Sequence, residues 1–514
     1  MSPETLEGSE PLLLPDDKHN RKTVSNVHPS DWMNPEPSGT YHLVVLGAGT
    51  AGLISAIGSA GLGAKVALVE KHLMGGDCLN VGCVPSKGLL RAARAYAEVR
   101  DADGFGVRVP DGTRVDFPAV MERMRRLRAR ISDNDGARRY RDAGVDVFLG
   151  HGKFTGPDSL VVDGKTLRFK KAVIATGARA AAPPIPGLAE AGYLTNETVF
   201  SLTELPKRLA IIGAGPIGCE LAQAFARFGS QVHLIESADH ILIREDPDAA
   251  AVVEKSLIRD GVDLVCCGAL RSVSKRGADK VLSLEAHGDK RELVVDEILV
   301  GVGRAPNVES IGLEAAGVAF DPRVGITVDE TLRTANPAIF AAGDVCFPYK
   351  FTHTAEALAK IVIQNALFAP LPFLCKKTSA LTIPWTTYTD PEIAHVGMYE
   401  KDARDRGIAV KTIVEPLKDV DRAILDGEDD GFVKIHYEDG TDRILGATLV
   451  AKHAGEMISE LTLAMTAGVG LGTLADTIHP YPTQAEAIKR AAGQWKRTKL
   501  TPFVKSLFKW WLGD

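Results

Sequence analysis

Two copies of one glycine pattern constrain the fold of this chain more than any other feature. In the first copy, a β-rich run from Leu43 to Leu46 precedes Gly47, Gly49 and Gly52, and a small-residue helix and a second apolar strand follow. Glycine at these positions permits a tight turn, lets a pyrophosphate approach the backbone and lets the helix pack close to the strand. The helix N-terminus offers N–H groups to phosphate, and Glu70, at the end of the second strand, can accept hydrogen bonds from an adenosine ribose. We therefore predict a strand–turn–helix–strand unit that binds a dinucleotide.

The second copy lies in RLAIIGAGPIGCELAQAFARFGSQVHLIES, with Gly213, Gly215, Gly218 and a terminal acid at Glu236. Two dinucleotide sites in one chain indicate a relay, in which one nucleotide stays bound while the other arrives and leaves. Glu236 would bond a 2′-hydroxyl and repel a 2′-phosphate, so NADH is favoured over NADPH. Arg244 lies eight residues further on and could still reach a phosphate, which leaves NADPH open.

Length and charge narrow the class of protein. A chain of 514 residues is too long for one hydrophobic core, so about two to four domains are expected. A net charge of -6 gives no general reason to expect nucleic-acid binding, and the start, MSPETLEGSE, does not have the pattern of a secretory signal. The uncharged run from Leu43 to Ala64 has the length of a membrane span. Glycines interrupt it and its period changes midway, so we interpret it as a strand followed by a helix.

The seven cysteines are too few and too unevenly spaced for a secreted disulfide framework, which favours a reducing, cytoplasmic setting. Two of them, Cys78 and Cys83, lie in GGDCLNVGCVPSK, directly before the helix-forming run GLLRAARAYAEVR. A helix N-terminus lowers the pKa of a nearby thiol, so we expect reactive thiols here. Zinc is the main alternative for a cysteine pair, but no second pair or histidine set stands at ligand spacing, and no metal site is predicted.

GGDCLNVGCVPSK, together with ATG at 175–177, GVGRAPN at 301–307 and AAGD at 341–344, closely resembles the flavoprotein disulfide reductases. This family includes dihydrolipoamide dehydrogenase, glutathione reductase and mercuric reductase, and the resemblance covers roughly residues 40 to 490. It implies FAD on the first glycine motif and NAD(P)H on the second, with hydride passing to the flavin. The reduced flavin would then open a Cys78–Cys83 disulfide. Cys83 would face the flavin as the charge-transfer thiolate, and Cys78 would be the interchange thiol that meets the substrate.

The resemblance assigns further roles. Lys87 would lie near flavin N5 in a buried ion pair with Glu220, and Asp344 would bond the flavin ribityl chain. Thr352 would open a helix whose N-terminus faces the flavin C2 carbonyl. Four more residues of these motifs are expected to contact the cofactors: Gly76, Thr176, Gly177 and Gly303.

The chain departs from the family near its C-terminus. Most members carry His-Pro-Thr-x-x-Glu, in which the histidine is the general acid/base, whereas this chain reads IHPYPTQAEA. Alignment on the Pro-Thr pair and on Glu486 places Tyr481 in the catalytic position, with His479 two residues earlier. Tyrosine has an ordinary pKa near 10 and is a poor base at neutral pH. Efficient turnover of lipoamide or glutathione is therefore not expected from this site.

Mercuric reductases also place a tyrosine there, but they end in a vicinal cysteine pair, and this chain has no cysteine after Cys375. The vicinal Cys266 and Cys267 lie in an apolar run that we expect to be a buried strand. Three functions stay open. The chain is a mercuric-reductase-like oxidoreductase for Hg(II), a small disulfide or a quinone; a dihydrolipoamide dehydrogenase with His479 recruited as base; or a flavin redox sensor at a membrane surface.

The motif order predicts an α/β protein with two Rossmann-like dinucleotide-binding domains, for FAD and NAD, and an α+β C-terminal dimerisation domain. By resemblance the chain forms a homodimer in which Tyr481 and Glu486 serve the cysteines of the other subunit. The basic tail can form an amphipathic helix that lies in a bilayer interface or, as we favour, packs on its own interface domain. The expected segments are an N-terminal arm at 1–38, the FAD domain at 39–190 and 305–380, the NAD(H) domain at 191–304, the interface domain at 381–495 and the tail at 496–514.

Overall fold

The structure is a computed structural model that describes residues 13–286, 288–369 and 371–513. Its contacts divide the chain into two compact units, each described here by itself. The first unit contains the described residues through Gly213, with Ala224–Ser237 and Gly268–Ala380. The second contains Ala214–Gln223, Ala238–Cys267 and the described residues from Leu381 onward. The finer division expected from the motif order stays a prediction.

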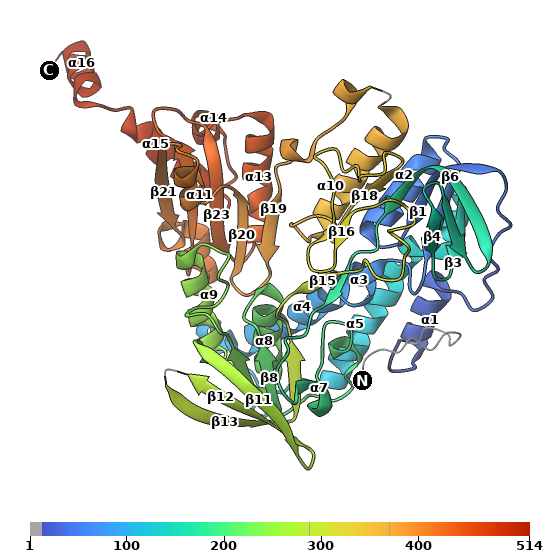
Figure 1. Cartoon of the computed structure of the whole chain (residues 1–514). Helices are drawn as coiled ribbons and strands as arrows, with labels where there is room; N and C mark the ends of the chain where they lie inside the picture. Colours follow the sequence, from blue (N-terminus) through green and yellow to red (C-terminus); the bar gives the residue numbers. More distant parts are fainter. Residues whose placement is uncertain (1–12, 287, 370, 514) are drawn as a thin grey trace. The chain divides into compact units, whose positions relative to one another are not determined.

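The first unit contains a seven-stranded sheet (Figure 1). Its strands lie in the order β3-β2-β1-β6-β5-β4, and β18 pairs with β6 off this path. Strands β3, β2, β1, β6 and β18 are joined by parallel pairing, whereas β4 and β5 are antiparallel. All the residues of β2 are buried, as expected of a parallel strand covered on both faces. The strands are β1 (Thr40–Leu46), β2 (Val66–Glu70), β3 (Val145–Leu149), β4 (Lys153–Gly156), β5 (Ser159–Val162), β6 (Lys165–Ile174) and β18 (Ile339–Ala341).

Helices accompany this sheet, and α2 packs against α10. The uncharged run that could have been a membrane span is β1, a glycine turn and α2, as predicted. Within the described ranges, no helix is both long and apolar enough to cross a bilayer. The main helices of this unit are α1 (Lys18–Val27), α2 (Thr50–Gly61), α3 (Gly76–Asn80), α4 (Cys83–Arg100), α5 (Phe117–Ile131), α6 (Ala137–Asp142) and α10 (Thr352–Ile363).

The second predicted strand–turn–helix–strand is also present. It consists of β8 (Arg208–Ile212), α8 (Pro216–Phe228) and β9 (Gln231–Ile235), with β14 (Glu297–Val300) parallel to β8 on its other side. An antiparallel sheet is inserted before β14. Its strands are β11 (Gly268–Arg276), β12 (Asp279–Ala286) and β13 (Asp289–Val295).

The second unit is built on a five-stranded antiparallel sheet in the order β19-β20-β23-β22-β21. The central strand β23 is buried along its whole length. Leu449 of this strand shares a hydrophobic core with Leu461 of α13 and Ile488 of α15. The strands are β19 (Pro384–Thr387), β20 (Glu392–Gly397), β21 (Val410–Pro416), β22 (Phe432–Glu438) and β23 (Ile444–Ala451). The main helices are α9 (Pro247–Arg259), α11 (Glu400–Asp405), α12 (Asp421–Asp426), α13 (Ala454–Ala467), α14 (Leu471–Asp476), α15 (Glu486–Thr498) and α16 (Pro502–Leu512).

Two expectations are wrong. Cys266 and Cys267 do not lie in a buried strand, because β10 (Asp263–Val265) ends before them and both cysteines are half-buried in the turn that follows. The backbone φ of +53° at Cys267 is incompatible with a strand. The tail helix α16 does not pack on its own chain, because none of its residues is buried. Thr501 and Pro502 begin it as a new helix, so its apolar stripe does not continue the buried face of α15.

Candidate redox site

The first glycine loop fits the backbone so tightly that side chains are excluded. Gly47 has a φ of +102°, and a Cβ there would collide with the carbonyl of Ala175. A Cβ on Gly52 would overlap the carbonyl oxygen of Gly47. Gly49 is the N-cap residue that precedes α2, and no side chain caps that helix, so its first turn can offer N–H groups to an anion. The loop is therefore a cradle into which a phosphate can approach the backbone.

Glu70 ends β2 beside this loop. Its Oε2 accepts a hydrogen bond from the Ala48 amide at 2.7 Å, and its Oε1 accepts one from the His72 amide at 2.8 Å. Burial raises the pKa of Glu70, and these two N–H groups oppose that shift. Each carboxylate oxygen keeps a second lone pair, so Glu70 can also accept from the hydroxyls of a ribose.

The cysteine-bearing segment lies against the same loop. Gly76, with a φ of +57°, approaches Gly49 so closely that a Cβ would stand 2.7 Å from the Cα of Gly49. Cys78 lies within the short helix α3, and Cys83 is the first residue of α4. The hydroxyl of Thr352, where α10 begins, is 3.4 Å from the Cys83 sulfur. The fold therefore brings the start of α10 to the thiol that begins α4.

The two thiols are coupled. No disulfide joins them in this structure, and the Cys78 thiol is hydrogen-bonded with Cys83. This bond, burial and the charge of Cys83 raise the pKa of Cys78, while Thr352 opposes the rise. The expectation of a lowered pKa is therefore wrong for Cys78. The physical reason is that two adjacent thiolates would repel each other, so the neighbouring Cys83 sulfur and burial both favour the protonated form of Cys78.

Arg304 is a site residue to which sequence reasoning gave no role. Its guanidinium donates to a carboxylate oxygen of Asp77, next to Cys78, and to the Ala178 carbonyl at 2.7 Å. Its Nε lies 3.3 Å from a carboxylate oxygen of Asp344. Burial raises the pKa of Asp344, and Arg304 opposes that rise. The available signal was the arginine in GVGRAPN and the aspartate in GGDC, but Arg304 and Asp77 lie 227 positions apart.

The ATG and GVGRAPN motifs are joined to each other. The Thr176 hydroxyl donates to the Asn307 carbonyl at 2.7 Å, and the Asn307 side chain donates to the Thr176 carbonyl at 2.9 Å. The Asn307 amide donates to the Gly177 carbonyl at 3.0 Å. Gly303, with a φ of +156°, accepts from the Ala181 amide. These bonds fix the end of β6 beside the segment that carries Arg304.

The second glycine loop shows the same steric restriction. Gly213 has a φ of +99°, and a Cβ there would lie 2.9 Å from the Gly301 carbonyl oxygen. Glu236 directly follows β9, where an acid can meet a ribose. Gly215 and Gly218 belong to the second unit, and their part in nucleotide binding stays a prediction.

The predicted acid/base residues lie in the second unit. Tyr481 is 71% exposed, and its hydroxyl donates to Asp421 at 2.9 Å, a bond that raises the pKa of Tyr481. The ring of His479 is turned inward, with 6% of its side chain exposed, and its Nε2 lies 3.0 Å from Glu460. Glu486 begins α15. The tyrosine therefore occupies the outward position and the histidine does not.

The expected Lys87–Glu220 pair stays a prediction. Glu220 is buried, and its Oε1 accepts the Tyr388 amide at 2.9 Å.

Comparison with known proteins identifies the family. Residues 41–359 match the family described as pyridine nucleotide-disulphide oxidoreductase, and residues 383–492 match its dimerisation domain. The chain belongs to this family. It is 36% identical to a mercuric reductase from Bacillus cereus, covering 89% of this chain and 72% of that one. It is 34% identical to a dihydrolipoyl dehydrogenase from Chlamydia muridarum, covering 88% and 96%.

Among solved structures, it is similar to the HOCl-induced flavoprotein disulfide reductase RclA from Escherichia coli. The TM-score is 0.78, with 30% identity over 88% of this chain and 99% of that chain. A Cu(II) complex of RclA matches with a TM-score of 0.77 and 29% identity, covering 87% of this chain and 98% of that one. The predicted family and fold class are therefore confirmed, and the protein is an NAD(P)H-dependent flavin oxidoreductase.

The residues of this oxidoreductase fit its flavin. Gly47, Gly49 and Gly52 leave the room that a pyrophosphate needs beside the backbone, and the buried Glu70 carboxylate beside this loop would accept from a ribose. Asp344 and Thr352 approach the cysteine segment from the second part of the same unit. These residues would hold FAD, which would supply the electron relay to the cysteine pair.

Proposed function

We propose that this oxidoreductase passes electrons from NADH to a Cys78–Cys83 disulfide and reduces a soft metal ion, Hg(II) foremost. The observation that carries the choice of acceptor is the outward position of Tyr481, where dithiol chemistry needs a base. His479 would have to leave Glu460 to act as that base, which argues against a dihydrolipoamide dehydrogenase. The mercuric reductase relative and the Cu(II) complex of RclA also favour a metal acceptor. A small disulfide or a quinone are the other acceptors to test.

The balance of the reaction is simple. NADH gives NAD⁺, a proton and two electrons, and Hg(II) takes two electrons to become Hg(0). FAD, when bound, supplies the relay between nicotinamide and the cysteine pair. The disulfide takes two electrons and the one proton from NADH to become a thiol at Cys78, whose pKa is raised, and a thiolate at Cys83, which would face the flavin. Arg304 neutralises Asp77 beside them, so that a second negative charge does not oppose the thiolate.

Three finer features belong to this proposal. The enzyme works as a homodimer in a reducing cytoplasm, and Tyr481 and Glu486 serve the partner subunit's cysteines. The match to a dimerisation domain and the exposure of Tyr481 support this arrangement. The acid at Glu236 favours NADH over NADPH.

An anaerobic NADH titration, followed by a panel of Hg(II), lipoamide, glutathione disulfide and quinones, tests the function. We expect many turnovers with Hg(II) and slow turnover with lipoamide. Tyr481→Phe should lower the rate with Hg(II) by at least about tenfold, because it removes the only hydroxyl of that side chain. Rapid lipoamide turnover by the unmodified enzyme, together with an unchanged rate for Tyr481→Phe, would refute the choice of acceptor.

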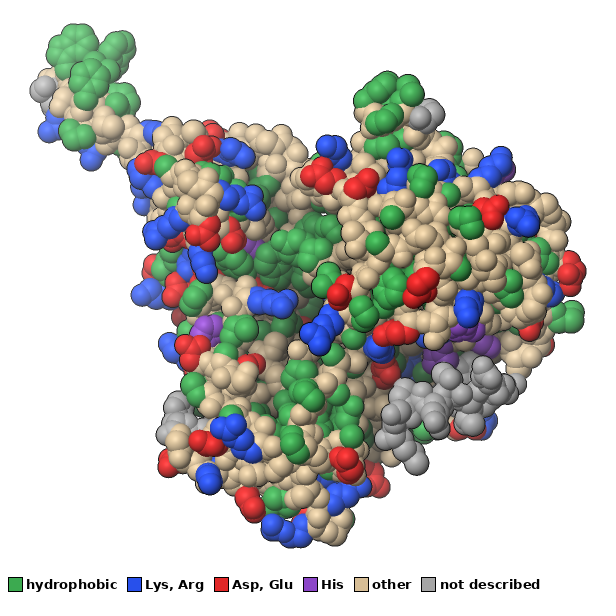
Figure 2. Space-filling view, viewed as in Figure 1, with side chains coloured by type: hydrophobic (Ala, Val, Ile, Leu, Met, Phe, Trp, Pro, Cys, Tyr) green, Lys and Arg blue, Asp and Glu red, His purple; other side chains and the backbone are tan. Residues whose placement is uncertain are grey.

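A second candidate is a flavin redox sensor at a membrane surface, and the observation that favours it is the exposure of α16. Phe503, Trp510 and Trp511 are 72–78% exposed, and hydrophobic side chains gather on this helix in Figure 2. Lys505 and Lys509 lie off the apolar stripe, so the helix suits an anionic bilayer interface. When liposomes rich in phosphatidylserine are sedimented, the intact protein should be found in the pellet with them, and a variant ending at Thr498 should not. Equal recovery of both in the supernatant excludes membrane contact.

A further inference from the structure

The described part of the N-terminal arm, residues 13–38, precedes the part of the chain that matches the family, yet it is bonded into the first unit. Trp32 and Asn34 of the arm lie beside β3, an edge strand of the sheet. The Trp32 indole donates to the Val147 carbonyl at 3.2 Å. The Asn34 side chain donates to the Leu149 carbonyl at 2.9 Å and accepts from the Leu149 amide at 2.7 Å. The arm therefore pairs groups that an edge strand would leave exposed.

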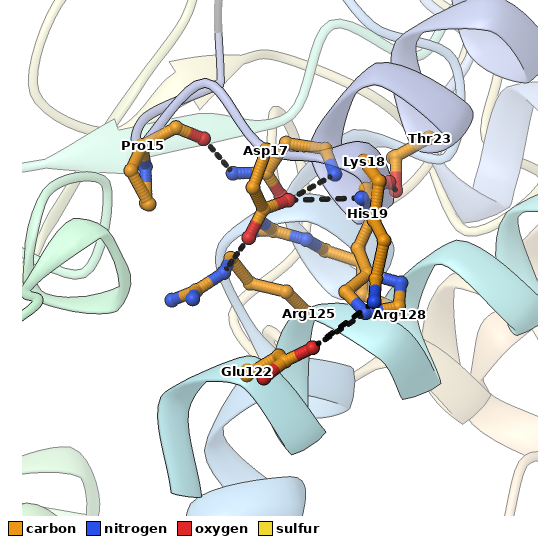
Figure 3. A network of polar contacts seen from close by, with 9 residues as sticks. Pro15, Asp17, Lys18, His19, Thr23, Glu122, Arg125 and Arg128 are labelled. Atoms are coloured by element: carbon orange, nitrogen blue, oxygen red, sulfur yellow. Dashed lines mark hydrogen bonds and ion pairs between the residues drawn. The ribbon is translucent and has the colours of Figure 1, made fainter. Parts of the chain in front are cut away.

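The helix of the arm, α1, is fastened to α5 by a charged network (Figure 3). Asp17 caps α1, and its Oδ1 accepts from the amides of His19 and Asn20. Its Oδ2 accepts from Arg125 Nε at 2.5 Å. Burial alone would raise the pKa of Asp17, but the Asn20 amide and Arg125 bring that pKa below its ordinary value. Figure 3 shows Glu122 of α5 facing the same turn, where the His19 ring lies 3.3 Å from its carboxylate.

One turn further along α5, Arg128 is a buried cation with two neutral partners. Only 2% of the residue is exposed. Its Nη2 donates to the Asn20 side-chain oxygen at 2.7 Å, and its Nη1 donates to the Asn80 carbonyl at 2.6 Å. Burial, followed by the charge of Arg125, lowers the pKa of Arg128 to about 10, so it stays charged at neutral pH. Arg128 thus connects the arm to the segment between the two cysteines.

Asn80 holds that segment together. It is 4% exposed, and its side chain donates to the carbonyls of Met74 at 3.1 Å and Gly76 at 2.9 Å. The arm also reaches this segment directly. The Met74 amide donates to the Val27 carbonyl at 3.3 Å, and the His28 ring is hydrogen-bonded with the His72 carbonyl. Two direct hydrogen bonds and one link through Arg128 therefore join the arm to residues 72–80.

We propose that the N-terminal arm is a positioning element of the Cys78–Cys83 pair, acting through Asn20, Arg128 and Asn80. The proposal rests on the proposed redox function of that pair. Loss of the Asn20 oxygen leaves an N–H of a buried cation without its acceptor, so Arg128 moves toward water and away from Asn80. Arg128 is bonded to the Asn80 carbonyl, two residues from Cys78, and a cation close to a thiol stabilises thiolate relative to disulfide. Without it the pair becomes harder to reduce.

The test compares two asparagines of the same helix in the FAD-loaded, full-length protein. Asn20→Ala removes the acceptor of Arg128. Asn26→Ala is the matched control, because its side chain donates to Ser132 at 2.9 Å and Asp133 at 2.7 Å and not to Arg128 or Asn80. Each protein is equilibrated with dithiothreitol buffers of fixed oxidation ratio, and the thiols of Cys78 and Cys83 are alkylated and counted by mass spectrometry.

We expect Asn20→Ala to lower the equilibrium constant for reduction at least about threefold, or about 15 mV, and Asn26→Ala to leave it unchanged. Arg128→Met should shift the equilibrium constant for reduction in the same direction. In the double variant, Asn20→Ala should cause no further shift beyond that of Arg128→Met. If Arg128→Met does not fold, Arg128→Lys replaces it. The lysine ammonium would keep the charge but lose the two-pronged contact, so Asn20→Ala should shift that background less than it shifts the unmodified protein.

If Asn20→Ala changes the equilibrium constant for reduction by less than twofold, or if Asn26→Ala changes it equally, the role of the arm is overturned and the redox function is not. If the unmodified protein forms no Cys78–Cys83 disulfide in oxidising buffer, the redox function fails and the role of the arm falls with it.

Discussion

Asp135 provides a sharp test of the electrostatics around the cysteine pair. Burial raises its pKa from 3.8 to about 6, although Arg139 opposes the shift. Its Oδ2 lies 3.0 Å from where a Cβ on Gly75 would stand, and its charge contributes to the raised pKa of Cys78. A shift of this size corresponds to about 3 kcal/mol between the two protonation states. The ionisation of Asp135 therefore makes the stability of the fold depend on pH. Replacement of Asp135 by asparagine, which is neutral and similar in shape, should remove this dependence.

Proton binding by Asp135 decides whether the stability of the fold rises or falls with pH. Because the folded-state pKa is raised, the folded protein holds this proton more tightly than the unfolded chain does. The resulting stability is fully present below pH about 4 and is lost as the pH rises through about 6. Asp135→Asn should therefore match the unmodified protein near pH 4. At pH 7 it should be more stable by about 2–3 kcal/mol.

Urea unfolding at saturating FAD, at several pH values between 4 and 7, measures the difference. Asp133→Asn is the control, because that carboxylate is 60% exposed and its removal should change the stability by less than about 1 kcal/mol at every pH. Alkylation of Cys78 as a function of pH gives a second readout, since its pKa should fall when Asp135 is neutral. If the stability difference between Asp135→Asn and the unmodified protein stays the same from pH 4 to 7, the pKa of Asp135 is not raised in the folded protein and the reasoning is refuted.

Three further predictions follow from the site. Arg304→Met leaves the carboxylates of Asp77 and Asp344 without their cation, so it should lower the free energy of unfolding in urea by about 3 kcal/mol. Adding Asp77→Asn should restore part of that loss. If Arg304→Met causes no loss of stability, solvent screens these charges. Gly52→Ala should reduce the flavin bound per chain more than tenfold, as measured by absorbance, whereas a Cβ on Gly61 of the same helix meets nothing within 4 Å, so Gly61→Ala should bind normally. Tyr481→His supplies a base and should raise lipoamide turnover at least about tenfold; an unchanged rate would show that this position does not serve the cysteines.

The parts of the fold that depend on neighbours in sequence were predictable. A strand, three glycines, a helix and a strand ending in an acid follow from sterics within about thirty residues, and β1, α2 and β2 appear where the pattern places them. The same holds for β8, α8 and β9. The departure at Tyr481 was also visible, because it is a change of one residue within a short motif.

Features that depend on distant contacts were not predictable. The Arg304–Asp77 pair joins residues 227 positions apart, and Arg128 meets Asn20 across 108 positions. The helix-dipole argument for lowered thiol pKa values considered each cysteine alone, whereas the coupling between Cys78 and Cys83 dominates the outcome. The apolar run around Cys266 suggested a strand, but the backbone at Cys267 has a positive φ that periodicity cannot reveal.

The short segment that carries the cysteines is fixed from three directions by three kinds of force. Gly76 is pressed against Gly49, Asp77 is paired with Arg304, and Asn80 is bonded to Arg128. A thiol pair that is oxidised and reduced in every cycle must return its two sulfur atoms to one geometry, because a disulfide tolerates only a narrow range of Cα and Cβ separations. Steric, ionic and hydrogen-bonded restraints fail under different conditions, namely added volume, added salt and removal of a partner. A loop held by all three keeps its geometry when any one weakens, so single changes in its supports should shift the reduction equilibrium by small factors and not abolish it.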